Sequence, residues 1–379
     1  MLSIILKIFF WFSIFMIFYA YFGYPLFLGI FALFTNKSIK RKEITPFVSF
    51  IITAYNEEKH IAEKIENTLA QDYPMDRLEI IVASDCSTDK TDDIVKSYET
   101  RGVRLVRAPQ RLGKESTQKY AVDTAKGKIL VFSDVATILD TFGVRTIVKN
   151  FNDPTIGCVS SEDKFLDRKG NVSGEGAYVK YEMLLRRLES KVNTLVGLSG
   201  SFFAARRELC EPWATDLQSD FNTLINSVKR RYRGICDENA IGYYQDLAES
   251  NQEFNRKVRT IVRGIRVFMQ SLPMLNIFKY GLFSWQFFSH KLCRWTVPFW
   301  MIAAFVTNLL LFRSSILFLG LFIFQSAFYA LSLVGAMTKT KKLPVKLPSF
   351  FVAANLSVLI AWYKYFKGEH FIKWEPSTR

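Results

Sequence analysis

Four long apolar segments constrain this chain more than any other feature of its sequence. Residues 2–34 carry a single charge, Lys7, and form a segment longer than the roughly 20 residues that span a bilayer. Three further apolar segments lie at roughly 296–312, 315–337 and 348–366. A cleaved signal peptide would have a shorter apolar run and a small-residue cleavage site, which the first segment lacks. We therefore predict an integral, multi-pass membrane protein with one N-terminal and three C-terminal transmembrane helices.

The distribution of charge agrees with this prediction. The chain has 379 residues with 50 Lys+Arg and 35 Asp+Glu, a formal net charge of +15. Residues 37–266 hold 37 of the bases and 33 of the acids, so the remainder holds 13 bases and two acids. Most of the positive excess therefore flanks the apolar segments, where anionic lipid headgroups favour it. A nucleic-acid-binding protein would carry the excess on its polar domain, so we expect no nucleic-acid partner.

The basic clusters also indicate an orientation. One cluster follows the first span: Lys37, Lys40, Arg41 and Lys42. Another joins the last two spans: Lys339, Lys341, Lys342 and Lys346. Loops rich in Lys and Arg stay in the cytoplasm, so we expect the polar domain on the cytoplasmic side of a bacterial inner membrane. The span count then places the tail outside although it too is basic, with Lys364, Lys367, Lys373 and Arg379. Either the last segment is re-entrant or the rule fails for the tail.

A mixed segment precedes the C-terminal spans. Residues 268–294 are largely apolar but include Lys279, His290, Lys291 and Arg294. This mixture is typical of an amphipathic helix lying in the membrane interface, and packing between polar domain and membrane helices is the alternative. The predicted organisation is thus an N-terminal anchor at 1–35, a polar domain at 36–266, an interfacial region at 267–294, and a transmembrane region with tail at 295–379.

The polar domain alternates predicted strands and helices. The strands are Phe47–Thr53, Leu78–Ser84, Val103–Arg107 and Lys128–Ser133, and the helices are Glu58–Ala70, Thr91–Arg101 and Lys114–Ala125. Such alternation indicates an α/β fold, a Rossmann-like, mostly parallel, doubly wound sheet. Right-handed crossovers bring the carboxyl ends of the strands to one edge, where ligands bind.

Carboxylates follow three of these strands: Glu57, Asp85 and Asp134. Neither a G-x-G-x-x-G after the first strand nor a P-loop is present, and no two of the five cysteines have C-x-x-C spacing. A dinucleotide fingerprint, a P-loop and a zinc site are therefore unsupported. Carboxylates at a sheet edge can accept hydrogen bonds from a ribose or a base, or hold a divalent metal that carries a diphosphate.

Several blocks of this domain resemble a known family. They are residues 48–58 (VSFIITAYNEE), 79–91 (EIIVASDCSTDKT), 111–114 (RLGK), 127–134 (GKILVFSD), 197–207 (GLSGSFFAARR) and 219–221 (SDF). In this order they resemble family 2 glycosyltransferases, which are inverting enzymes with the GT-A fold, and the flanking spans resemble the membrane-bound polysaccharide-synthase branch. The resemblance covers about residues 45–295.

The resemblance implies roles for the residues on the donor side. Ala54, Tyr55 and Glu57 would line the nucleotide pocket, Asp85 would bind the uracil or ribose, and Lys114 would lie near the phosphates.

The resemblance also implies a metal site with one departure from the family pattern. Asp134 takes the first place of the D-x-D motif that holds Mg²⁺ or Mn²⁺ on the sugar-nucleotide diphosphate, but Ala136 stands in the second place. One carboxylate ligand is lost, so the metal would be held by Asp134, the diphosphate and water.

On the acceptor side the resemblance assigns Asp220 as the general base, which takes the proton of the acceptor hydroxyl. Asp216 is a neighbouring alternative, and a plain helix N-cap before Phe221–Val228 is the structural alternative for Asp220. Ser199, Gly200 and Ser201 belong to the acceptor or diphosphate region by the same resemblance.

A basic helix face is the last candidate. Arg256, Arg259, Arg263 and Arg266 recur at spacings that place them on one face of a helix. The family has a Q-x-x-R-W block in this region, and here Arg256 and Arg259 would contact diphosphate and acceptor, although both the Gln and the Trp are missing. Contact with lipid headgroups is the alternative.

These implications lead to two hypotheses. The first is inverting transfer of a sugar from a UDP-linked donor to a lipid-linked or growing glycan acceptor at the inner face of the membrane. The second is a catalytically impaired subunit that acts as a scaffold with other subunits in polysaccharide biosynthesis or export. Membrane lipids are partners in both. A transporter is disfavoured because the predicted spans contain no acidic residue that could form a coupling site.

Overall fold

The computed structural model describes residues 1–35, 37–166, 177–245, 250–338, 342–369 and 371. These residues divide into two compact units. The membrane-helix unit is drawn from the described residues of 1–27, 253–265 and 284–369, and the sheet unit mainly from those of 28–252 and 266–283. Of the basic residues named above, Lys339, Lys341, Lys373 and Arg379 lie outside the described residues.

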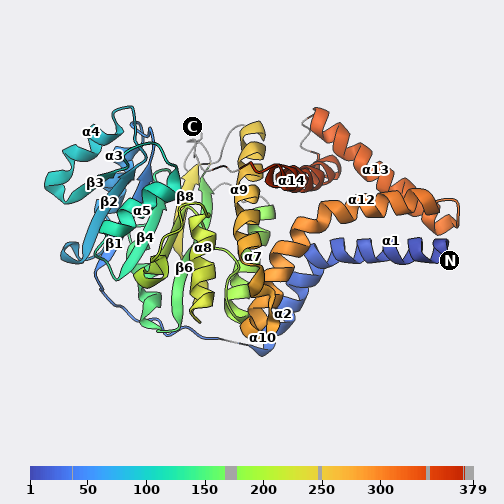
Figure 1. Cartoon of the computed structure of the whole chain (residues 1–379), viewed down its shortest axis with the longest axis horizontal. Helices are drawn as coiled ribbons and strands as arrows, with labels where there is room; N and C mark the ends of the chain where they lie inside the picture. The colour runs from blue at the N-terminus through green and yellow to red at the C-terminus, as the bar shows by residue number, and fades with distance from the viewer. Residues whose placement is uncertain (36, 167–176, 246–249, 339–341, 370, 372–379) are drawn as a thin grey trace. The chain divides into compact units, whose positions relative to one another are not determined.

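One eight-stranded sheet forms the centre of the sheet unit, in the order β3-β2-β1-β4-β7-β6-β8-β5 (Figure 1). The strands are β1 (Val48–Ala54), β2 (Leu78–Ser84), β3 (Val103–Arg107), β4 (Ile129–Asp134), β5 (Ile138–Leu139), β6 (Ile156–Leu166), β7 (Phe202–Arg206) and β8 (Arg233–Gln245). The first four confirm the predicted strands to within one residue at each end.

The predicted half of the sheet is parallel. Val48 of β1 pairs with Leu78 of β2 on one side and with Ile129 of β4 on the other, and β2 pairs with β3 in the same sense. The order 3-2-1-4 reverses direction between β1 and β4, and such a switch point opens a crevice at the carboxyl ends of the strands.

The remaining strands were not foreseen from the sequence. β7 runs antiparallel to both β4 and β6, β8 is parallel to β6, and β5 is antiparallel to β8. They place Ser133 opposite Phe202 and Ser160 opposite Phe203. The segment before β7 therefore meets the carboxyl end of β4.

Helices cover both faces of the sheet, as a doubly wound fold requires. Between β1 and β8 the helices of this unit are α3 (Ile61–Leu69), α4 (Thr91–Ser97), α5 (Lys114–Thr124), α6 (Gly143–Val148), α7 (Ala177–Val192) and α8 (Ser219–Lys229). Phe50 packs in a core with Ile61 and Val144, whereas Ile51 packs in a second core with Ala121 and Leu224. Neighbouring residues of a strand point to opposite faces, so β1 is buried on both sides and its run of apolar residues is explained.

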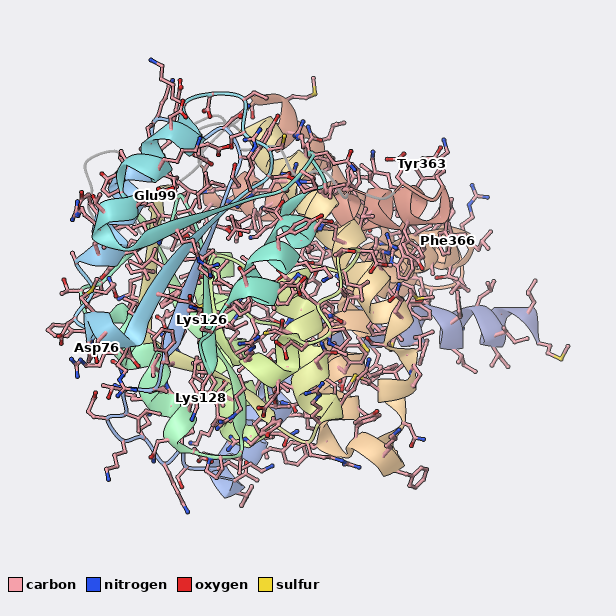
Figure 2. The ribbon with its side chains drawn as sticks, turned by 60° about the vertical axis from the view of Figure 1, so that its left-hand side comes forward. Asp76, Glu99, Lys126, Lys128, Tyr363 and Phe366 are labelled. Atoms are coloured by element: carbon pink, nitrogen blue, oxygen red, sulfur yellow. The ribbon has the colours of Figure 1, made fainter. Side chains whose placement is uncertain are left out.

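The edge with the carboxyl ends of the parallel strands is the one that matters for the site. Asp76 and Lys128, which precede β2 and β4, mark the opposite edge (Figure 2).

The membrane-helix unit contains the three C-terminal predicted spans and the first 26 residues, Leu2–Phe27, of the N-terminal one. Its main helices are α1 (Leu2–Phe18), α12 (Arg294–Leu311), α13 (Ile316–Thr338) and α14 (Leu343–Phe366), and α12 packs against the other three. Four helical stretches are long and apolar enough to cross a membrane: Leu2–Phe34, Leu282–Leu311, Ile316–Thr338 and Leu343–Phe366. One N-terminal and three C-terminal candidates confirm the prediction, with earlier starts for the first and third C-terminal spans.

The segment 268–294 is not one helix. The long helix α9 (Ser250–Gln270) enters it, and the short helix α10 (Ile277–Tyr280) is capped by the Asn276 side chain and ends at Gly281, whose φ is +56°. The short α11 (Leu282–Phe287) then leads through a π-helical turn, Phe288–Cys293, into α12. Its location in the membrane interface stays a prediction.

Candidate active site

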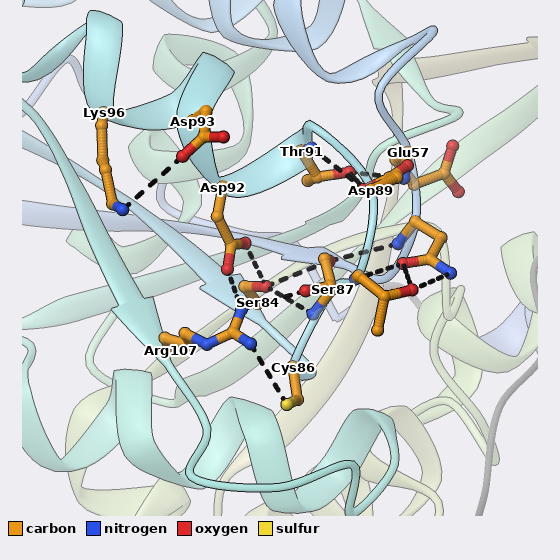
Figure 3. Close-up of polar contacts among 12 residues, drawn as sticks. Glu57, Ser84, Cys86, Ser87, Asp89, Thr91, Asp92, Asp93, Lys96 and Arg107 are labelled. Carbon is orange, nitrogen blue, oxygen red and sulfur yellow. Dashed lines mark hydrogen bonds and ion pairs between the residues drawn. The ribbon is translucent and has the colours of Figure 1, made fainter.

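Two loops at the carboxyl ends of β1 and β2 are tied together by side-chain hydrogen bonds (Figure 3). The Asn56 side-chain oxygen accepts from the Thr88 backbone amide at 2.8 Å, and the Asn56 backbone amide donates to Ser87 Oγ at 3.2 Å. The Glu57 amide donates to Thr91 Oγ1 at 2.8 Å. Residues 48–58 and 79–91, the first two blocks of the family resemblance, are thus adjacent, as expected for loops at one edge of a parallel sheet.

The end of β3 is fastened to the same loops. Arg107 forms an ion pair with Asp92, and its Nη1 donates to the Ser87 carbonyl at 3.1 Å (Figure 3). Ser84 Oγ donates to Asp92 Oδ1 at 2.5 Å. The loop therefore has a fixed shape before any ligand binds, which reduces the entropy that binding would cost.

Asp85 is fully buried beneath these loops. Its carboxylate accepts from the amides of Leu112 at 2.9 Å and Gly113 at 3.0 Å, and from Thr117 Oγ1 at 3.0 Å. Gly113 has a φ of +94°, which glycine adopts without strain. Asp85 thus fixes the loop that leads into α5, and its contact with a uracil or ribose stays a prediction.

Two side chains from separate loops stack at the same edge. The Arg111 guanidinium lies 4.1 Å from the centre of the Tyr55 ring, within the range of a cation–π interaction. Tyr55 is half-buried, Ala54 is buried and Glu57 is half-buried. The stacked Tyr55 and Arg111 side chains therefore form a planar, partly accessible surface at the predicted nucleotide pocket. Arg111 was not among the candidate site residues predicted from the sequence.

Lys114 and Asp134 meet directly. Lys114 Nζ lies 2.5 Å from Asp134 Oδ1 and donates to the Gly200 carbonyl at 3.3 Å. The Asp134 amide donates to the Ser201 carbonyl at 3.0 Å. The segment Ser199–Ser201 is thus bound to both residues of the donor side.

Electrostatics keep Lys114 charged. Burial by itself would lower the pKa of Lys114, but the carboxylates of Asp134, Glu115 and Asp220 outweigh it and the pKa is raised. A protonated ammonium in a sheltered position can stabilise charge that develops on a diphosphate.

Asp220 lies in the first turn of α8 and is 8% exposed. The helix begins at Ser219 with Gln218 in the cap position, so reading Asp220 as the N-cap is wrong. Gln218 Nε2 donates to Asp220 Oδ2 at 3.2 Å. A methyl group at Gly200 would lie 3.5 Å from Asp220 Cγ, so the Gly200 backbone directly borders the carboxylate.

The alternative base is engaged elsewhere. Asp216 Oδ2 lies 2.7 Å from Arg266 Nη2 and forms an ion pair with it. Arg266, the last arginine of the predicted basic helix face, therefore has a carboxylate partner within the sheet unit.

Lys64 is a buried cation behind the site that sequence reasoning missed. Its Nζ donates to Ser133 Oγ at 2.8 Å and to the Thr137 carbonyl at 2.5 Å, so it joins the two ends of the turn that carries Asp134. Burial lowers the pKa of Lys64 to about 7, opposed by the charge of Asp134. A signal was available, because Lys64 lies one turn after Ile61 on the apolar face of its helix.

The basic helix was correctly predicted as a helix. Arg256 and Arg259 lie on α9, in the part of it that belongs to the membrane-helix unit. Between them, Lys257 Nζ lies 5.1 Å from the centre of the Phe350 ring of α14. Contact of either arginine with diphosphate or acceptor stays a prediction.

The donor set for a metal is small. Among the described residues no three His, Cys, Asp or Glu side chains form a group that could hold a metal ion. Asp134 is 34% exposed, and Ala136 offers no ligand. Because Mg²⁺ is commonly held by one or two carboxylates together with substrate phosphates, Asp134 fits as its protein ligand.

Known proteins show which family and fold this chain is similar to. Residues 49–212 match the family model described as glycosyl transferase family 2. The chain is 25% identical over 178 residues to poly-beta-1,6-N-acetyl-D-glucosamine synthase of Staphylococcus aureus, covering 45% of this chain and 42% of that protein. It is 26% identical over 225 residues to beta-monoglucosyldiacylglycerol synthase of Nostoc, covering 55% and 47%. Each match thus spans less than half of the curated relative's length.

A solved structure is similar over almost the whole chain. The mannosyltransferase PcManGT from Pyrobaculum calidifontis, in complex with GDP-Man and Mn²⁺, superimposes with a TM-score of 0.72 at 22% sequence identity, covering 93% of this chain and 97% of that one. The similarity shows that the two chains share a fold.

Proposed function

We propose that this chain, which carries a family 2 glycosyltransferase domain of GT-A fold, transfers a sugar, with inversion, from a UDP-linked donor to a lipid-linked or growing glycan acceptor. One observation carries the proposal. The Lys114–Asp134 pair and the Asp220 carboxylate both border a single backbone segment, at Gly200. Groups suited to a diphosphate and a group suited to an acceptor hydroxyl therefore share one sheet edge.

On the donor side the protein supplies a cation and a carboxylate. Asp134 would hold Mg²⁺ or Mn²⁺ on the diphosphate, and the metal when bound neutralises charge on the leaving group. Lys114 is released from Asp134 toward the phosphate oxygens and stabilises the negative charge that forms as the bond to the anomeric carbon breaks. Tyr55, Glu57 and Asp85 bind or position the nucleoside.

On the acceptor side Asp220 acts as the general base. The acceptor oxygen forms its bond to the anomeric carbon as the bond from that carbon to the diphosphate breaks, and the hydroxyl proton passes to the Asp220 carboxylate. General-base catalysis of this kind contributes about 10²–10⁴-fold. The first turn of a helix favours a negatively charged side chain, which suits Asp220 to accept the proton.

The spans support an acceptor at the membrane. We propose that the sheet unit acts at the cytoplasmic face of a bacterial inner membrane and that Arg256 and Arg259 approach the diphosphate or the acceptor. Other subunits of polysaccharide biosynthesis or export are candidate partners. The catalytically impaired scaffold is not favoured, because Asp85, Lys114, Asp134 and Asp220 are all present and the last three are assembled around Gly200.

The test measures nucleotide release by the full chain in lipid nanodiscs with Mg²⁺ or Mn²⁺. Donors are UDP-N-acetylglucosamine, UDP-glucose and GDP-mannose, and acceptors are diacylglycerol, a polyprenyl phosphate and a glucosamine oligomer. We expect release of UDP that depends on an acceptor and falls by about 10²–10⁴-fold in Asp220→Asn, with UDP affinity retained.

Asp216→Asn is the matched control, since it removes a neighbouring carboxylate that is paired with Arg266. Equal turnover by Asp220→Asn and the parent would refute the assignment of the base. Release of GDP from GDP-mannose, with none of UDP, would replace the proposed donor.

A further inference from the structure

A buried acid outside every sequence block holds the segment on which the proposed site depends. Asp163 lies in β6 and is 7% exposed. Its Oδ1 accepts three hydroxyl hydrogen bonds, from Ser199 at 2.6 Å, Ser201 at 3.0 Å and Ser161 at 3.2 Å. Arg186 Nη1 of α7 lies 3.6 Å from its other oxygen.

Two of these serines enclose Gly200. The Gly200 carbonyl accepts from Lys114, and the Ser201 carbonyl accepts from the Asp134 amide. The Gly200 backbone also borders the Asp220 carboxylate. A displacement of this short segment would therefore move the donor-side groups and the base relative to each other.

Side chains, together with one backbone bond from the Asp134 amide to the Ser201 carbonyl, hold this segment in place. β7 begins only at Phe202, so Ser199–Ser201 precede the strand ladder. The Ser199 amide donates to Ser160 Oγ at 2.8 Å. The hydroxyl oxygens of Ser199 and Ser201 lie 2.8 Å apart. Because a carboxylate is a stronger acceptor than a neutral oxygen, Asp163 is the main anchor of this network.

We propose that Asp163 is a positioning residue for the transfer reaction. Through Ser199 and Ser201 it sets the place of Gly200 and so the alignment of Lys114 and Asp134 with Asp220. The expected effect of Asp163 on turnover rests on the proposed function, whereas the effect of Asp163 on the segment Ser199–Ser201 can be measured without turnover.

The experiment compares Asp163→Ala and Asp163→Asn in the full chain. The asparagine oxygen can still accept from the serines, whereas alanine offers no acceptor. Since a misplacement of about 1 Å can cost 10²-fold in rate, we expect kcat to fall by about 100-fold in Asp163→Ala and to recover by about tenfold or more in Asp163→Asn. The dissociation constant of UDP should change by less than about threefold in both, since the nucleotide loops are held by other bonds.

A second readout is independent of catalysis. Acetylation of Lys114 by acetic anhydride, followed by mass spectrometry and normalised to the exposed Lys126, reports whether the ammonium is still held by Gly200. We expect faster labelling of Lys114 in Asp163→Ala. If Asp163→Ala does not fold, the double variant Ser199→Ala, Ser201→Ala replaces it with the same expected effects.

Asp237→Asn is the matched control for a merely structural role. Asp237 is also a buried strand carboxylate, but its partners are the Asn150 side chain at 2.7 Å, the Asn239 amide at 3.1 Å and Arg41 at 3.7 Å. We expect this variant to lose stability and to keep its kcat.

The outcomes separate the two proposals. A kcat of Asp163→Ala near that of the parent, or an equal loss in Asp237→Asn, would overturn the inference. A parent that releases no nucleotide from any donor would refute the proposed function, and the labelling of Lys114 would then decide: faster labelling supports the positioning role and unchanged labelling overturns it.

Discussion

The buried ammonium of Lys64 makes the stability of the sheet unit depend on pH in a predictable direction. The pKa of Lys64 is lowered from 10.5 to about 7 in the folded chain, mainly by burial. Below pH 7 both states bind the proton, and between pH 7 and 10.5 the unfolded state binds more protons than the folded state. Stability therefore rises with pH across this window, by up to about 1.4 kcal/mol per pH unit.

Lys64→Met removes this dependence. The variant also leaves Ser133 Oγ and the Thr137 carbonyl without their donor, at a cost of about 1–3 kcal/mol for each group that stays unsatisfied. That cost does not change with pH, so the pH-dependent part can be isolated. Relative to the parent, the variant should lose about 2 kcal/mol of stability between pH 7 and pH 9.

The assay is thermal unfolding at a fixed scan rate from pH 6 to pH 9.5, followed by intrinsic fluorescence. For a unit of this size the expected change corresponds to roughly 4–8 °C in the difference between the two melting temperatures. Lys126→Met, which removes an exposed lysine, should give a constant difference. Parallel pH profiles of Lys64→Met and the parent would contradict the assignment of a neutralised, buried lysine.

Two further predictions concern ligand binding. Asp85→Ala releases the amides of Leu112 and Gly113, so UDP should bind at least about tenfold more weakly, a loss of about 1.4 kcal/mol. Unchanged UDP affinity in calorimetry would show that Asp85 does not contribute to the pocket. Ala136→Asp adds a second carboxylate near Asp134, and metal affinity rises with the charge of the ligand set. In the presence of UDP, Mn²⁺ should then bind about tenfold more tightly, as measured by electron paramagnetic resonance. An equal or weaker Mn²⁺ affinity would show that position 136 does not face the metal.

The parallel half of the sheet and the spans were predictable because their signals are local. The run Val48–Ala54 is buried along its whole length, so a short, continuous, β-branched segment identified it. The spans are identified by length and hydropathy alone. The strands after residue 134 were not predicted from the sequence, because β6 and β8 contain polar residues such as Asp163 and Asp237, whose burial depends on distant partners.

The same division holds within the candidate site. The blocks around Asp85, Lys114, Asp134 and Asp220 could be placed in order along the chain, because each follows a strand or begins a helix. That Lys114 lies 2.5 Å from Asp134 could not be foreseen, and neither could the place of Gly200 beside Asp220. Those contacts join residues 20 or more positions apart.

The sequence by itself determined that this chain has membrane spans at both ends, an α/β domain between them and carboxylates at one edge of its sheet. Hydropathy, periodicity and strand–helix alternation are properties of neighbouring residues, and they need no knowledge of the fold. Only the tertiary structure decided which polar groups are buried together. It showed that Asp85 fastens a loop, that Lys64 supports the turn of Asp134, and that Asp163 anchors the segment at Gly200, because a buried charge is stable only where the whole fold supplies its partners.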